Sequence, residues 1–127
     1  MSTTPFESKE DIYRFFHLQW DNFPFPVLLI YKDRTILACN KPAQNIGILS
    51  GGRCYEMGPK NSHKGCQANQ ALEEKTAKHS VEYREDFGRV WDRYWVPLAG
   101  KEDIFLHFNI DITEHASPRF FPQGEIK

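Results

Sequence analysis

The chain has 127 residues, 40% of them hydrophobic and 14% aromatic, a length and composition that suit one folded domain and exclude a disordered chain. Its 16 basic and 17 acidic residues leave a formal net charge of −1, which disfavours direct binding to nucleic acid or to an anionic membrane surface. The longest strongly apolar run covers residues 27–30 and the N-terminus lacks a secretory signal, so we expect a cytoplasmic protein without a membrane span.

The first half of the chain predicts a helix, a hairpin and a second, short helix. Apolar side chains recur at helical spacing over residues 8–20, which predicts an amphipathic helix whose apolar stripe carries Ile12, Phe15, Phe16 and Trp20. Two prolines follow closely and end that helix. Residues 27–31 and 35–39 are rich in apolar and β-branched side chains and flank a short turn. They predict a β-hairpin, after which Asn40 caps a short helix.

The second half of the chain predicts a longer helix and three more strands. Residues 48–65 are rich in Gly, Ser and Asn and are expected to be irregular. Good helix formers predict a helix over residues 67–79, and three strands are predicted at residues 81–87, 90–98 and 104–112. The whole order predicts an α+β domain: a five-stranded antiparallel sheet with helices on one face and an amphipathic N-terminal helix.

Three local patterns, taken together, resemble the PAS family. The first is the opening hairpin followed by Asn40, the second is the Cys-Tyr-Glu segment at residues 54–56 with Cys66 before the next helix, and the third is the Asp-Ile-Thr-Glu ending at residues 111–114. The second pattern is similar to a bacterial subgroup of PAS domains. The resemblance covers roughly residues 20–115. Together with the predicted elements, it divides the chain into an N-terminal amphipathic helix at residues 1–22, a PAS-like sensory domain at residues 23–115 and a tail or linker at residues 116–127.

The resemblance implies a sensory module of signal transduction. Such a domain binds a small ligand or cofactor and relays its state to a partner effector, such as a histidine kinase, a cyclase or a transcription regulator, by rearranging a dimer or a helix. Only 13 residues follow Glu114, so we expect the effector to be a separate chain, the alternative being that this chain is a fragment of a longer one. We also expect the domain to form a homodimer. The alternative is a ligandless docking module of a kinase or transcription regulator. The sequence contains no nucleophile elbow or phosphate-binding loop, so no enzymatic activity is expected.

Alternation in the last predicted strand divides its side chains between two sheet faces. One set is Ile104, Leu106, Phe108 and Ile110, and the other is Phe105, His107, Asn109 and Asp111. We expect the first set to pack on the first helix. The resemblance places the second set toward a pocket. The alternative is that the second set lies on a sheet face open to solvent. The ligand-pocket candidates are Cys54, His63, Trp91, Phe105, His107 and Asn109.

The spacing of cysteine and histidine raises the question of a metal or haem site. Cys54, His63 and Cys66 follow the pattern Cys-x8-His-x2-Cys, and Cys39 completes a set of three thiolates and one imidazole suited to zinc. The alternative is three reduced, partly buried thiols. His63 as an axial haem ligand is a second hypothesis, with a surface histidine as its alternative. Flavin is disfavoured, because the strand asparagines used by the light-sensing PAS branch have no counterpart in residues 81–98.

Acidic side chains in the middle strands are interpreted as structural. They alternate with arginines at strand spacing, which favours cross-strand charge pairs over a catalytic pair of carboxylates. The acidic residues are Glu82, Glu85, Asp86 and Asp92, and the basic ones are Arg84, Arg89 and Arg93.

Overall fold

The computed structural model describes residues 9–54 and 65–122. Its helices are α1 (Lys9–Trp20), α2 (Lys41–Asn45) and α3 (Ala68–Glu74), followed by the short 3-10 helices η2 (Thr113–His115) and η3 (Pro118–Phe120). Its strands are β1 (Val27–Tyr31), β2 (Ile36–Cys39), β3 (Lys78–Arg84), β4 (Arg89–Leu98) and β5 (Lys101–Asp111). None of the helices in these two ranges combines the length and the apolar character that crossing a bilayer requires.

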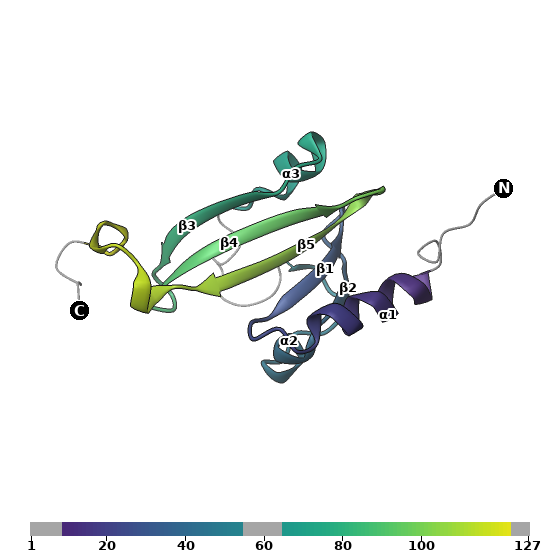
Figure 1. Ribbon diagram of the computed structural model, residues 1–127, viewed down its shortest axis with the longest axis horizontal. Coiled ribbons are helices and arrows are strands. Elements are labelled where there is room, and N and C mark those ends of the chain that lie inside the picture. Colours follow the sequence, from purple (N-terminus) through teal and green to yellow (C-terminus); the bar gives the residue numbers. More distant parts are fainter. Residues whose placement is uncertain (1–8, 55–64, 123–127) are drawn as a thin grey trace.

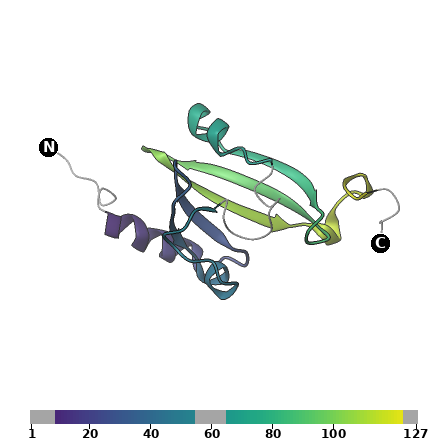
Figure 2. The ribbon, with the colours of Figure 1, turned by 180° about the vertical axis from the view of Figure 1, so that it is seen from behind.

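The five strands form one antiparallel sheet in the order β2-β1-β5-β4-β3. The last strand in the chain therefore lies in the middle and joins the N-terminal hairpin to the other strands. Helices α2 and α3 pack on one face of the sheet, which we call the inner face, and α1 packs on the opposite, outer face (Figures 1 and 2). The predicted five-stranded α+β architecture is confirmed.

Each face of the sheet has its own hydrophobic core, because neighbouring strand residues point to opposite sides. Leu28 of β1 belongs to the inner core, whereas Leu29 belongs to the outer core and meets Phe16 of α1 there. All three side chains are buried. Small residues of α2 and α3 let these helices approach the inner face closely, namely Ala43, Ala68 and Ala71.

The side chain of Asn40 joins three segments at one end of the sheet. Its Oδ1 accepts hydrogen bonds from the backbone N–H of Val27 (2.8 Å) and of Ala43 (3.2 Å). Its Nδ2 donates to the carbonyl oxygens of Trp20 (2.8 Å) and Phe25 (3.0 Å). The predicted cap of α2 is confirmed, and the same side chain also fixes the end of α1 against the start of β1.

Several element boundaries differ from the predicted ones. Helix α3 ends at Glu74, not at residue 79, because Lys75 takes the left-handed conformation (φ 54°) that ends helices. The chain then enters β3 at Lys78, so the strand predicted at residues 81–87 is displaced toward the N-terminus. Strand β5 begins at Lys101, since the preceding turn is short and Gly100 supplies the positive φ (81°) that it needs.

The start of the predicted tail folds back on the sheet. Helix η3 of this tail contacts β3, and η2, which lies just before the tail, contacts β4. The ring of Phe121 lies 6.1 Å from that of Tyr83 in β3, measured between centroids. Residues 116–122 therefore cover part of the sheet, and the rest of the predicted tail lies outside the described residues.

Candidate functional site

The inner face carries the strand side chains that the sequence assigned to a pocket. Phe105 lies in the inner core, while its neighbour Leu106 lies in the outer core. The β4–β5 register places His107 opposite Trp95, and it places Asn109 opposite Arg93. The predicted division of β5 between two faces is therefore confirmed, with Phe105, His107 and Asn109 on the side covered by α2 and α3. The name inner-face site is used below for Glu82, Arg93, Trp95, His107 and Asn109.

His107 is held in one orientation by its neighbours. Its ring stacks on that of Trp95, with centroids 5.1 Å apart and planes inclined by 16°. Its Nδ1 lies 2.8 Å from the backbone carbonyl oxygen of Tyr94. Because a carbonyl oxygen only accepts, Nδ1 carries the hydrogen in this contact, and Nε2 is the lone-pair nitrogen of the neutral ring.

Arg93 is a buried cation in the middle of the inner face. It is 2% exposed, its guanidinium lies 4.9 Å from the centroid of the Trp95 ring, and its Nη1 lies 3.3 Å from a carboxylate oxygen of Glu82. The same carboxylate accepts hydrogen bonds from Ser80 Oγ at 2.6 Å and from Arg84 Nη1 at 3.1 Å. Burial lowers the pKa of Arg93, Arg84 adds to this effect, and Glu82 opposes it. Glu82–Arg93 is therefore one of the predicted cross-strand charge pairs, whereas Arg84 contacts Glu82 within one strand.

Other predicted charge pairs have different partners. Asp92 lies 2.8 Å from Nδ1 of His79 in the neighbouring strand. Arg89 donates to Asp111 of β5 at 2.8 Å. Burial alone would raise the pKa of Asp111, but hydrogen bonds from Arg89 and Thr113 hold it below the usual value. These contacts link neighbouring strands and stabilise the sheet.

Asn109 has a buried acceptor that nothing in the described part of the chain satisfies. Its Oδ1 is buried and has no hydrogen-bond partner among those residues. A buried polar atom of this kind costs about 1–3 kcal/mol of folding free energy. Since Asn109 lies across the strand pair from Arg93, a ligand that donates to Oδ1 would lie beside a buried positive charge.

Trp91, another predicted pocket residue, lies at the margin of the inner face. Its ring packs against Phe87 near the β3–β4 turn, with centroids 4.6 Å apart. The aromatic side chain at the centre is instead Trp95, which is 1% exposed. Neither Trp95 nor Arg93 was among the predicted pocket residues. The sequence pattern could have identified both residues. Trp91, Arg93 and Trp95 stand two residues apart in one strand and must share a face.

Gly65 is a further residue at the site that sequence reasoning missed. A Cβ atom at this position would lie 3.3 Å from both carboxylate oxygens of Glu82 and 3.4 Å from Nη1 of Arg93. The residue also has φ +82°, a conformation that favours glycine. The chain therefore approaches the Glu82–Arg93 pair closely because residue 65 has no side chain.

The three cysteines gather at the inner core. Cys39 is buried and its Sγ donates to the carbonyl oxygen of Ile48 at 3.4 Å, while Cys54 and Cys66 pack at the margin of that core. Burial raises the pKa of the Cys39 thiol, and the charge of Asp21 adds to the shift, so this thiol stays protonated at neutral pH.

Predicted metal ligation rests partly on a residue that the structure does not describe. Across residues 9–54 and 65–122, no three side chains of His, Cys, Asp or Glu lie close enough together to hold a metal ion. His63 lies outside these ranges. The zinc set of Cys39, Cys54, His63 and Cys66 and the axial haem ligand His63 therefore stay predictions.

Comparison with known proteins identifies the fold. No family model and no curated protein matches the sequence. A domain of an HTR-like protein from Haloarcula marismortui is 22% identical over 71% of this chain and 99% of that one, with a TM-score of 0.57. A sensory box sensor histidine kinase from Vibrio cholerae is 16% identical over 74% of this chain and 83% of that one, with a TM-score of 0.59. The PAS domain of BvgS from Bordetella pertussis is 21% identical over 80% of this chain and 86% of that one, with a TM-score of 0.53.

These structural similarities extend over 71–80% of the chain, with TM-scores of 0.53–0.59. The domain therefore has a PAS fold. Tyr55 and Glu56, which carry the resemblance to the Cys-Tyr-Glu subgroup, lie outside the described residues, so membership of that subgroup stays a prediction.

Proposed function

We propose that this domain is a sensory module that binds a small ligand or cofactor at the inner-face site and relays its state to a partner effector. The observation that carries the proposal is the buried Oδ1 of Asn109, which lacks a hydrogen-bond partner among the described residues. Selection for stability alone would remove such an acceptor, whereas a binding site retains it for the ligand. The stacked ring of His107 and the buried charge of Arg93 provide two further polar groups around it.

The PAS fold supports the sensory part of the proposal. The similar Vibrio cholerae structure belongs to a sensor histidine kinase, which favours a kinase over a cyclase or a transcription regulator as the effector class. Fold alone does not define function, so the effector and its encounter with this chain in the cytoplasm belong to the proposal. The proposal gives the domain no catalytic step and no direct contact with nucleic acid or membrane.

Helix α1 is the element that we assign to the relay and to a homodimer. Phe16 is buried against the outer face, whereas Leu18 is 73% exposed. An exposed leucine on a docked helix suits contact with a second copy. The substitution Leu18→Glu should therefore shift the sedimentation of the protein from dimer to monomer. Leu49 lies beyond α2 and is 68% exposed, so Leu49→Glu is the control and should leave the dimer intact. A monomeric wild-type protein would contradict the dimer.

The first experiment is the absorption spectrum of freshly purified protein, with metal analysis of the same sample. A haem or iron–sulfur band, or stoichiometric zinc, would show a cofactor and direct substitutions to His63, Cys54 and Cys66. A spectrum with protein bands alone would leave a colourless ligand, which native mass spectrometry can detect as added mass lost on unfolding.

Asn109→Ala separates ligand binding from folding. Because the variant removes a buried acceptor that lacks a partner among the described residues, we expect the free energy of unfolding to be unchanged or to rise by about 1 kcal/mol. The same variant should lose the bound ligand. Asn69→Ala, at an exposed residue that accepts from Arg34, serves as the matched control and should retain the ligand. Retention of the ligand by Asn109→Ala would contradict the assigned site.

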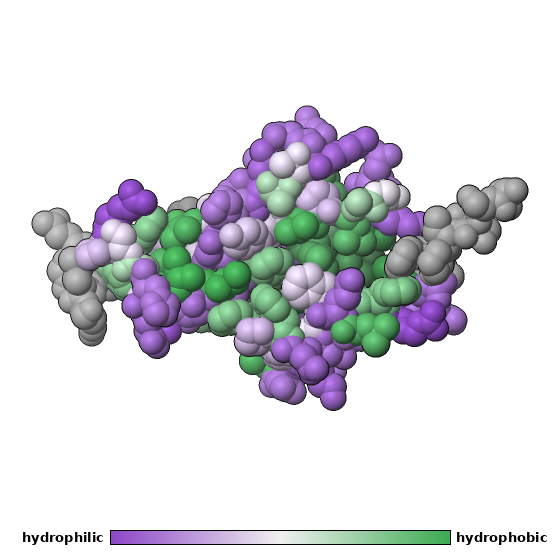
Figure 3. All heavy atoms as spheres, viewed as in Figure 1, coloured by the Kyte–Doolittle hydropathy of each residue, from purple (hydrophilic) through white to green (hydrophobic). Residues whose placement is uncertain are grey.

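A ligandless docking module is the second candidate function, and the outer face favours it. Apolar side chains on this face are only partly buried, and Figure 3, viewed from the side on which α1 lies, shows them gathered across the middle of the molecule. They include Val96, Leu98, Ile104 and Phe108. If the domain is a ligandless docking module, Val96→Ser should weaken its binding to a purified histidine kinase, and Asn109→Ala should leave that binding unchanged. The sensory function predicts instead that Asn109→Ala abolishes ligand-dependent regulation of the kinase.

A further inference from the structure

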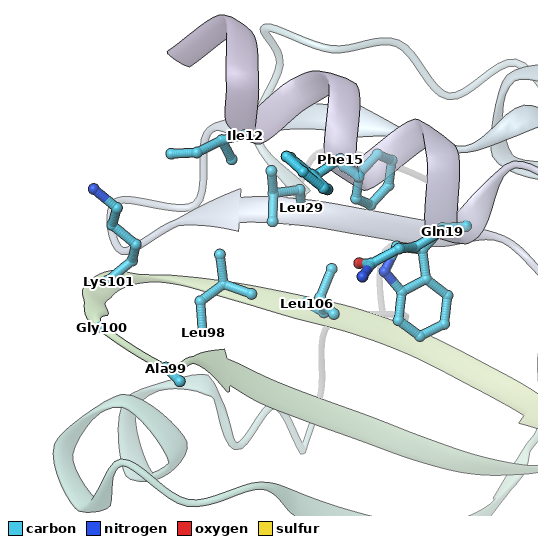
Figure 4. A pocket seen from close by; sticks show the side chains of 11 residues that line it. Ile12, Phe15, Gln19, Leu29, Leu98, Ala99, Gly100, Lys101 and Leu106 are labelled. Carbon is cyan, nitrogen blue, oxygen red and sulfur yellow. The ribbon is translucent and has the colours of Figure 1, made fainter. Parts of the chain in front are cut away.

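The outer face contains a cavity between α1 and the turn that joins β4 to β5. Its volume is about 500 Å³, which lies within the range of about 300–1,000 Å³ found for small-molecule sites. Side chains from the helix and from the sheet face each other across it (Figure 4). Its apolar walls are formed by Ile12, Phe15, Phe16, Leu29, Leu98 and Leu106.

The cavity follows from how α1 is attached to the sheet. At the C-terminal end of α1, the ring of Trp20 lies 5.2 Å from that of Phe23 and 5.7 Å from that of Phe108. One turn earlier, Phe16 is buried in the outer core. Nearer the N-terminus, Ile12 lines the cavity together with the side chains of the β4–β5 turn (Figure 4). An apolar space of this size, open at its edge, is suited to an alkyl chain.

Polar side chains stand at the ends of this apolar space. Lys101 lies at one end and Gln19 at the other (Figure 4). The two acidic residues that follow Lys101 have other partners, since Glu102 lies 2.9 Å from Lys75 and Asp103 lies 3.6 Å from Lys32. Within the described part of the chain, Lys101 forms no ion pair. The cavity therefore has an ammonium group at its rim that can receive an anion.

We propose that this cavity binds a medium-chain fatty acid, with the alkyl chain between α1 and the sheet and the carboxylate at Lys101. The apolar walls supply affinity in proportion to the chain length that they bury, and the ammonium group supplies preference for a negatively charged head group. The inference goes beyond the proposed function, because the cavity and the inner-face site lie on opposite faces of the sheet. Its test does not depend on a ligand at Asn109.

Calorimetric titration of the full chain with sodium octanoate, decanoate and dodecanoate, each below its micelle-forming concentration, tests the alkyl part. We expect each added methylene to tighten binding about two- to fourfold until the cavity is full. Decan-1-ol should bind about two- to fivefold more weakly than decanoate, because it lacks the charge. High salt should narrow that difference. The backbone amide signal of Gly100, which lines the cavity, should shift in NMR spectra during the titration.

Substitutions separate the head-group contact from the apolar space. Lys101→Gln should abolish the preference for decanoate over decan-1-ol and leave decan-1-ol binding unchanged. Lys32→Gln, at an exposed lysine outside the cavity lining, is the matched control and should retain the preference. Leu98→Trp and Ile12→Trp should each fill the cavity from opposite walls and abolish binding of both compounds, so a folding defect in one variant still leaves the other as a test.

Absence of saturable decanoate binding to the folded wild-type protein overturns the proposal. Binding that persists in both folded filling variants overturns it as well, because the ligand then lies elsewhere. If sedimentation instead shows a dimer that both filling variants dissociate and that decanoate leaves unchanged, the cavity receives a second copy of the chain and the proposal is wrong.

Discussion

At the scale of single residues, Asn40 concentrates four hydrogen bonds in one buried side chain. Asn40→Ala leaves the N–H of Val27 and the carbonyl of Trp20 without these partners in a buried environment, so we expect a loss of about 3 kcal/mol of unfolding free energy. Urea denaturation measures it. Asn69→Ala removes only an exposed contact to Arg34 and should cost far less. Equal losses in the two variants would contradict the assigned role.

The carboxylate of Asp111 makes part of the stability depend on pH. Hydrogen bonds from Arg89 and Thr113 outweigh the effect of burial and hold the folded-state pKa of Asp111 below 3.8. A depressed pKa means that the ionised form stabilises the fold above the unfolded-state pKa and that this contribution is lost as the pH falls through the folded-state pKa. Asp111→Asn should therefore lower the urea midpoint at pH 7, where the carboxyl is ionised in both states, and the difference from wild type should close as the pH falls below 3.8. A difference that does not depend on pH would contradict this assignment.

Alternation predicted which residues of β5 share a face, because period-two patterning depends on the backbone alone. It grouped Phe105 with His107, and the resemblance placed that group on the pocket side, where the structure has both residues. Alternation does not indicate which members of a face are central. Trp91 and Trp95 have the same parity, and only the β3–β4 turn, with Phe87 packed on Trp91, moves Trp91 to the margin. The unsatisfied acceptor of Asn109 was also beyond prediction, since it depends on which donors the fold brings near.

At the scale of elements, α1 is attached to the domain through few buried side chains. Phe16→Ala removes its anchor in the outer core, a change that costs roughly 3 kcal/mol or more in an ordinary core. Because a terminal helix can detach by itself, the global cost is limited to the free energy of its docking. We expect hydrogen exchange to accelerate about a hundredfold in α1 and to change little in β5. Arg14→Ala, at an exposed ion pair with Asp11, is the control within the helix, and equal acceleration in α1 and β5 would contradict local detachment.

Element boundaries were predictable where a residue fixes the backbone and not elsewhere. Strand β1 and the cap at Asn40 agree with prediction, because prolines precede the strand and an asparagine side chain caps the helix. The end of α3 was missed, since Lys75 has no intrinsic preference for its left-handed conformation. Pairing with β4 also draws Lys78 and His79 into a strand, a tertiary effect that overrides helix propensity.

At the scale of the whole molecule, one sheet separates two cores. Strands β1 and β5 contribute to both cores through alternate side chains, so a change on the inner face acts on strands that the outer face also needs. Helix α1 can leave the outer face while the strands stay paired. A ligand that binds the inner face more tightly in one state of α1 therefore shifts the population of that state, and the coupling free energy is the same in both directions.

The local detachment of α1 predicts different outcomes for core substitutions on the two faces. Trp95 is 1% exposed in the inner core, so Trp95→Ala should cost about 3–5 kcal/mol. The destabilised variant should unfold in one cooperative transition, in which circular dichroism and the fluorescence of the remaining tryptophans change together. Hydrogen exchange should accelerate in α1, β1 and β5 alike. Trp91→Phe, at the margin of the same face, is the control and should cost less than about 1.5 kcal/mol. If Trp95→Ala loosened β5 while α1 kept its protection, the two cores would be independent and the inner face would lack a route to the relay helix.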